Sequence, residues 1–154
     1  MLRARSTVLA AVLTAVLTAV LALTGCSADD TSRSQLSQTA KTASASARAA
    51  SLSIGLHEKD KLTEAVLDTA LEDVGQKLGS SANELTSLAA VGGIARQRDR
   101  ILAQVRSAQD TLLDAQSQLS VGKGGGDTLD PQRRRLAALS VTLQKESQAL
   151  EAHG

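Results

Sequence analysis

Between Ile94 and Leu119, core-type residues recur at alternating steps of four and three, and this spacing constrains the fold more than any other feature of the chain. The pattern keeps one face of a helix apolar, as packing between long helices requires. This seam consists of Ile94, Arg98, Ile101, Val105, Ala108, Leu112, Ala115 and Leu119, of which Arg98 is polar. A helix over residues 94–120 would be about 40 Å long at its normal rise per residue. The sequence therefore predicts a long helix that must pair with other helices.

Three further segments carry helical patterns. An Ala-rich seam with the same spacing comprises Leu36, Ala40, Ala43, Ala47, Ala50 and Ile54. An amphipathic pattern begins near Lys61 and contains Leu67, Leu71, Val74 and Leu78. A last helix is expected over residues 130–152, with Asp130 as N-cap, Pro131 at its first position, and Leu136, Leu139, Leu143 and Leu150 on one face. No segment sustains the apolar and polar alternation of a strand, so the fold class is predicted to be all-α.

Glycines suggest where these helices end. We expect a corner at Gly79-Ser80-Ser81, where Ser81 and Glu84 have the spacing of a capping box. Gly92-Gly93 predicts a break, because two glycines inside a helix cost about 2 kcal/mol relative to alanines. A helix that continued through them would instead form one rod over residues 82–120. Residues 122–127 contain four glycines and predict a loop. The expected architecture is an antiparallel up-down bundle, or a helical hairpin assembly, of three to four helices with a coiled-coil-like seam.

The N-terminal segment has the pattern of an export signal. Arg3 and Arg5 precede an uncharged apolar run from Val8 to Leu23, and small residues follow. The run is shorter than the about 20 residues that a membrane-spanning helix needs. An ordinary secretory signal would leave Cys26, the single cysteine of the chain, unexplained.

The residues Leu23-Thr24-Gly25-Cys26 resemble the lipobox of bacterial lipoproteins. The resemblance implies that a diacylglyceryl group is attached to Cys26, and that a signal peptidase recognises Leu23, Thr24 and Gly25 and cuts before the cysteine. It also implies a lipid-anchored protein at the cell membrane, facing away from the cytoplasm. The expected domains are a signal peptide (1–25), a lipidated cysteine with a Ser/Thr/Ala-rich tether that is partly helical (26–53), and a helical bundle (54–154).

Composition and histidine placement argue against several functions. The chain has no Phe, Tyr or Trp and a formal net charge of +1, so it offers neither stacking platforms nor a strong positive field for nucleic acid. His57 and His153 are its two histidines, and neither lies in a pattern typical of catalysis. His57, Glu58 and Asp60 lack the further His or Cys ligands of a transition-metal site. We therefore expect no enzyme activity, no cofactor and no metal.

Two groups of residues are candidates for binding. Arg98, Ile101, Val105 and Leu112 lie on the seam, which can pair with a helix of this chain, a protein partner or a second copy. Arg133, Arg134 and Arg135 form a basic cluster that is either a solvated face or a contact for anionic lipid or an anionic envelope polymer. The expected function is a non-enzymatic structural or protein-interaction module of the cell envelope. The alternative is a small lipoprotein that binds an apolar ligand or an anionic envelope polymer.

Overall fold

The structure, a computed structural model, describes residues 3–121 and 126–152, and the side chains of 29–121 and 128–152. In this part of the chain the elements are α1 (Arg3–His57), α2 (Glu64–Ser87), α3 (Gly92–Ser120), the short 3-10 helix η1 (Gly126–Leu129) and α4 (Asp130–Ala152). These residues form no strand, which confirms the predicted all-α class. None of the described helices is long and apolar enough to cross a membrane.

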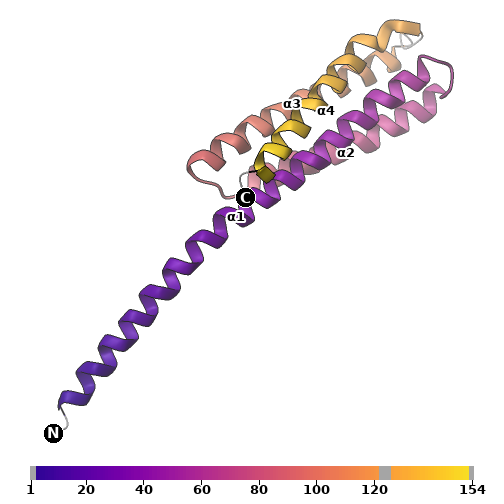
Figure 1. The fold of residues 1–154 in the computed structure, drawn as a ribbon. Coiled ribbons are helices and arrows are strands. Elements are labelled where there is room, and N and C mark those ends of the chain that lie inside the picture. Colours follow the sequence, from indigo (N-terminus) through magenta and orange to yellow (C-terminus); the bar gives the residue numbers. More distant parts are fainter. Residues whose placement is uncertain (1–2, 122–125, 153–154) are drawn as a thin grey trace.

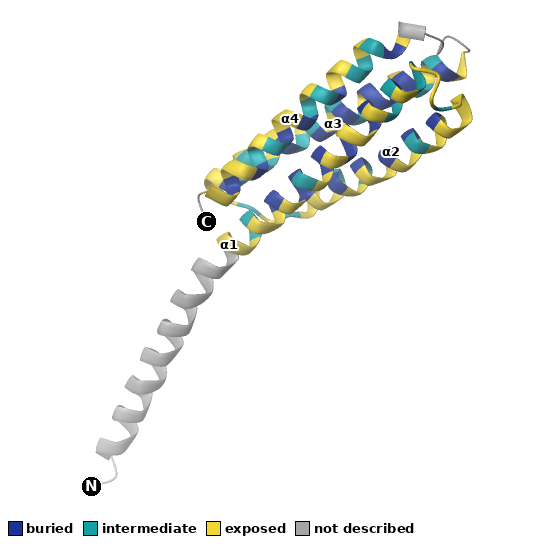
Figure 2. Cartoon of the chain, turned by 45° about the vertical axis from the view of Figure 1, so that its right-hand side comes forward, coloured by how far each residue is buried: buried dark blue, intermediate teal, exposed yellow. Residues whose placement is uncertain are grey.

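The helices form an up-down bundle (Figure 1). Contacts join α1 to α2, α2 to α3, α3 to α4, and α4 back to α1, so the four described helices surround one core. Buried residues line the inner faces of all four and exposed residues cover the outside (Figure 2). The bundle architecture is therefore confirmed, in its four-helix form.

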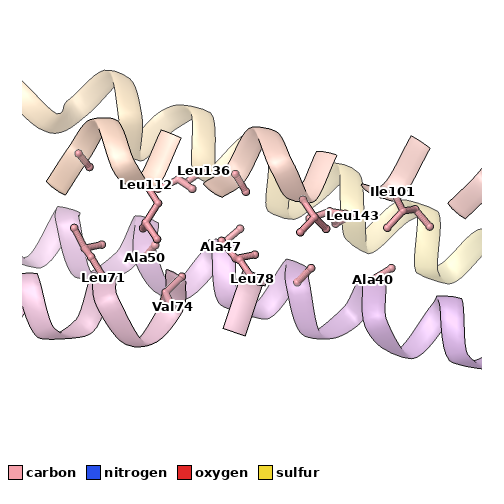
Figure 3. Packing of buried hydrophobic residues seen from close by; sticks show 14 of the residues in the cluster. Ala40, Ala47, Ala50, Leu71, Val74, Leu78, Ile101, Leu112, Leu136 and Leu143 are labelled. Carbon is pink, nitrogen blue, oxygen red and sulfur yellow. The ribbon is translucent and has the colours of Figure 1, made fainter. Parts of the chain in front are cut away.

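The core is built from the predicted seams. In α3, each seam residue except Arg98 is buried, and in α4 the buried leucines are Leu136, Leu143 and Leu150. The alanines of α1 and the leucines of the other helices meet in a shared interior (Figure 3). Without aromatic residues, this core depends on small and aliphatic side chains that let the helices approach closely.

The predicted corner at Gly79-Ser80-Ser81 is wrong, because α2 runs without interruption from Glu64 to Ser87. Ser81 and Leu85 continue its seam and are buried, and the N-cap is Thr63, whose Oγ1 accepts a hydrogen bond from the Val66 amide at 3.4 Å. A mid-helix glycine costs about 1 kcal/mol, whereas burial of one leucine contributes about 1.5 to 3 kcal/mol. Packing of Leu85 therefore outweighs the cost of Gly79.

A break beside Gly92-Gly93 is confirmed, at residues 88–91 just before the pair, and the single rod over residues 82–120 is excluded. Helix α2 ends at Ser87, residues 88–91 connect, and α3 begins at Gly92. Gly92 has a φ of 57°, in the left-handed region that a side chain disfavours. Gly92 therefore permits the reversal of chain direction between the two helices.

The predicted boundary between tether and bundle at residue 54 does not hold. Residues 29–57 are helical, and the α1 seam from Leu36 to Ile54 is fully buried. Serine and threonine lower helix propensity here, but burial of the seam outweighs that weakness. The lipobox, Cys26 and the signal peptide lie outside the residues whose side chains the structure describes, and so does the whole of the predicted loop at 122–127.

Candidate interaction surfaces

A ladder of serine hydrogen bonds joins α1 to α4. Its three serines are spaced by seven residues, and so are the carbonyls that accept their bonds. Ser37 Oγ donates to the carbonyl of Ser147 at 3.2 Å, Ser44 Oγ to that of Ser140 at 2.8 Å, and Ser51 Oγ to that of Arg133 at 3.0 Å. A hydroxyl that donates to a backbone carbonyl of the neighbouring helix requires close approach of the two chains. The α1 and α4 helices are thus held together by small side chains.

A groove lies on the outer side of this ladder, between α1 and α4. It has a volume of about 600 Å³, and its lining includes Arg48, Leu52, Val141 and Lys145. Leu52 is 59% exposed and Val141 is 55% exposed, one on each helix. In the described residues neither Arg48 nor Lys145 takes part in an ion pair. This α1/α4 groove therefore combines two exposed apolar side chains with two cations that have no carboxylate partner in the described residues.

Paired charges lie beyond one end of the groove. The Lys41 ammonium pairs with the Glu151 carboxylate, which also accepts a hydrogen bond from Ser37 Oγ at 3.2 Å. The hydrogen bond and charge of Lys41, and then the bond from Ser37, lower the pKa of Glu151 below its ordinary value. Lys41 is therefore already neutralised within the bundle, unlike Arg48.

The predicted arginine cluster is largely paired too. Arg133 Nε lies 2.9 Å from Glu58 Oε2, Arg133 also pairs with Asp130, and Arg134 Nε lies 2.6 Å from Asp130 Oδ2. The hydrogen bond to Asp130, with the charges of Glu58 and Asp130, raises the pKa of Arg133. Arg135 Nη2 donates to Ser107 Oγ at 3.2 Å. Arg135 therefore connects α4 to α3, Arg133 connects α4 to the segment that follows α1, and Arg134 pairs within α4, so the three arginines do not form one free basic patch.

Arg98 caps the C-terminal end of α2. Its Nη1 donates to the carbonyl of Leu88, the C-cap of α2, at 3.0 Å, and its Nη2 lies 2.8 Å from Asp99 Oδ1. A cation at a helix C-terminus satisfies a free carbonyl and complements the helix dipole. The polar position of the seam therefore serves the α2–α3 connection. Ile101, Val105 and Leu112, the other seam candidates, are buried inside the bundle and are covered by its own helices.

The face formed by α2 and α3 carries a feature that sequence analysis missed. A Cβ at Gly79 would lie 3.7 Å from Gln109 Nε2, so these two positions face each other. Leu113 follows Gln109 by four residues and Glu72 precedes Gly79 by seven, which places both on this same α2/α3 face. Leu113 is 62% exposed, and Asp110 and Glu72 beside it are exposed and form no ion pair in the described residues. Arg106, seven residues before Leu113, is also exposed on this side of α3, so the face has Leu113 at its centre with two carboxylates, Glu72 and Asp110, and one cation around it.

His57 and Glu58, two of the candidate metal ligands, have partners within the protein. His57 Nδ1 lies 2.9 Å from the Leu62 carbonyl, and Glu58 pairs with Arg133. Within the described residues no three His, Cys, Asp or Glu side chains are grouped as metal ligands would be. Comparison with family models, curated proteins and solved structures finds no match. The α1/α4 groove and the α2/α3 face are thus the surfaces on which a functional argument can rest.

Proposed function

We propose that this protein is a lipid-anchored, non-enzymatic interaction module at the cell membrane, facing away from the cytoplasm. The residues Leu23-Thr24-Gly25-Cys26 support the anchor, since two acyl chains on one cysteine hold a protein to a bilayer more firmly than a single chain does. The first core residue, Leu36, follows Cys26 by ten residues. Ten residues span at most about 35 Å, so the bundle would stand close to the lipid surface.

The observation that carries the interaction role is the α1/α4 groove. Leu52 and Val141 leave apolar area exposed there, while Arg48 and Lys145 stay without carboxylate partners in the described residues. Exposed apolar side chains bordered by charge are typical of surfaces that bind other macromolecules. In contrast, Arg133 is ion-paired with Glu58 and with Asp130 of its own helix, and the hollow that Arg133 and Glu58 line is open to solvent.

The anchor is tested by metabolic labelling with a palmitate analogue in a bacterial host, comparing the full-length chain with its Cys26→Ala variant. We expect the unaltered chain to incorporate the label and to be cut before Cys26. Cys26→Ala should incorporate none and keep residues 1–25. Ser27→Ala is the matched control and should be labelled normally. An unlabelled wild-type chain that is cut elsewhere would contradict the proposal.

A further inference from the structure

We propose that copies of this protein associate side by side on the membrane, with the α1/α4 groove of one copy receiving the α2/α3 face of the next. The proposed lipid anchor gives the copies their common orientation, so the inference rests on the proposed function in that respect. The two surfaces themselves are described by the structure. The partner for each surface is therefore the opposite surface of a second copy.

The two surfaces are complementary in charge and in apolar character. Arg48 and Lys145 border the groove, whereas Glu72 and Asp110 border Leu113 on the α2/α3 face. In the described residues these four side chains have no ion-pair partner. Complementary charges favour encounter and fix the relative position of two surfaces.

The two surfaces also lie at the same height along the bundle. Thr39 Oγ1 lies 3.1 Å from Glu84 Oε2, which sets the level of α2 against α1. Counting nine residues along each helix from this contact places Arg48 level with Gly75. A Cβ at Gly75 would lie 3.2 Å from Leu112 Cδ2, and Leu113 is the next residue of α3. Leu113 is therefore level with Arg48.

The apolar residues of the groove lie on either side of that level. Val141 follows Ser140, whose carbonyl is bonded to Ser44, so Val141 lies one turn of α1 from Arg48. Leu52 lies one turn from Arg48 in the other direction. A neighbouring Leu113 at the level of Arg48 therefore meets the space between Leu52 and Val141.

A sideways shift of one copy, without rotation, joins these surfaces. Helices α1 and α4 are neighbours, as are α2 and α3, so the groove and the α2/α3 face lie on opposite sides of the bundle (Figure 1). The shift sets α2 of one copy, with Glu72, against α1 of the next, with Arg48, and sets α3, with Asp110, against α4, which carries Lys145. Because each copy uses a different surface on each side, the contact extends into a row. Confinement to one membrane raises the effective concentration, which strengthens a contact that is weak in solution.

The contact can be tested by site-specific cross-linking in intact cells. One tagged full-length copy carries Gln109→Cys on the α2/α3 face and a second, differently tagged copy carries Gln144→Cys in the groove lining. We expect a bifunctional maleimide to join the two tags when the copies are co-expressed. Cells with Gln109→Cys alone should give no cross-linked dimer. A strong dimer from that variant alone would indicate a two-fold contact and overturn the proposal.

Charge reversal on each surface tests whether the two surfaces contact each other. The pair Arg48→Glu and Lys145→Glu reverses the groove, and the pair Glu72→Lys and Asp110→Lys reverses the α2/α3 face. Either reversal in both copies should lower cross-linking about tenfold or more, because like charges would face each other. A reversed groove on one copy with a reversed face on the other should restore it. Unchanged cross-linking, or failure of the combined reversal to restore it in folded chains, would overturn the inference.

Two controls separate this inference from the proposed anchor. The pair Lys61→Glu and Arg96→Glu changes net charge by the same amount as the groove reversal, at exposed positions outside both surfaces, and should leave cross-linking unchanged. Palmitate labelling is followed in the same cells. Label without cross-links overturns only the association, whereas cross-links without label overturn only the anchor.

Discussion

Ser44 shows how a single polar side chain holds two helices together. It is buried, and its hydroxyl reaches a backbone carbonyl of α4 at 2.8 Å. The hydrogen bond satisfies both groups, and the small side chain leaves room for the neighbouring backbone. The seven-residue spacing of Ser37, Ser44 and Ser51 is visible in the sequence. Their partners on α4 were not, because the register of two helices is a property of the packed bundle.

Ser44→Leu should destabilise the bundle by about 1 to 3 kcal/mol, since the larger side chain must separate α1 from α4. Ala45→Leu is the matched control, because Ala45 is exposed and the same side chain would project into solvent. Urea unfolding followed by circular dichroism measures both. Equal stability of the two variants would contradict close packing at Ser44.

The ion pair of Glu151 should make the stability of the bundle depend on pH, with lower stability in acid. Its pKa is lowered in the folded chain by Lys41 and Ser37, so its contribution to stability is present above its unfolded pKa of about 4.3 and is lost as pH falls through the lower folded pKa. Glu151→Gln should melt at a lower temperature than the unaltered chain near neutral pH, and the gap should close in acid. Thermal melts from pH 7 to pH 2 measure this. Asp114→Asn, at a position without an ion pair in the described residues, should show no such closing gap.

At the scale of elements, α2 shows how local signals can mislead. Gly79-Ser80-Ser81 has the composition of a corner, but Leu78, Ser81 and Leu85 keep the steps of the seam through it. The continuing periodicity was the better signal, because burial of Leu85 depends on it. At Gly92 the seams on either side do not join, and there the glycine does mark a break.

Alanine substitutions distinguish these two glycines. Gly79→Ala should stabilise the chain by about 1 kcal/mol, because α2 is helical there and the added Cβ makes ordinary contact with Gln109. Gly92→Ala should destabilise it by about 1 to 2 kcal/mol, because its φ of 57° is strained for a side chain. Thermal unfolding of both variants is the measurement. If Gly79→Ala destabilised the chain, the result would support the predicted corner at Gly79 instead of a continuous helix.

For the whole molecule, the sequence predicted the fold class, the seams of α1 and α3, most of the buried residues of α2 and α4, and the break beside Gly92. It misplaced the start of the bundle, because a Ser/Thr/Ala-rich composition is shared by flexible tethers and closely packed helices. It missed the α1/α4 groove and the acidic side chains around Leu113 as well. Which side chains of α1 and α4 border one groove depends on helix register and on which helices are neighbours.

A deletion tests the limits of the bundle. Removal of residues 27–53 should abolish cooperative unfolding, since it takes away the α1 seam from Leu36 to Ala50 and opens the core of the other helices. Removal of residues 27–30 alone should leave the fold intact, because it ends before that seam. Far-UV circular dichroism with thermal melts compares the two chains. If the chain still formed a stable, cooperative bundle after the longer deletion, residues 27–53 would be a tether and not part of the bundle.

The serine ladder does not by itself fix how α4 is aligned along α1. Any backbone carbonyl can accept a serine hydroxyl, and the buried alanines of α1 are alike from Ala40 to Ala50. A shift of α4 by one heptad would therefore keep two of the three serine hydrogen bonds, and would replace two of the four alanine contacts with contacts to another alanine. The contacts of residues 40–50 with α4 therefore do not favour one alignment of the two helices over the next. The larger buried residues at the two ends of this seam, Leu36 and Ile54, would not fit where an alanine packs, and they therefore select a single alignment of the two helices.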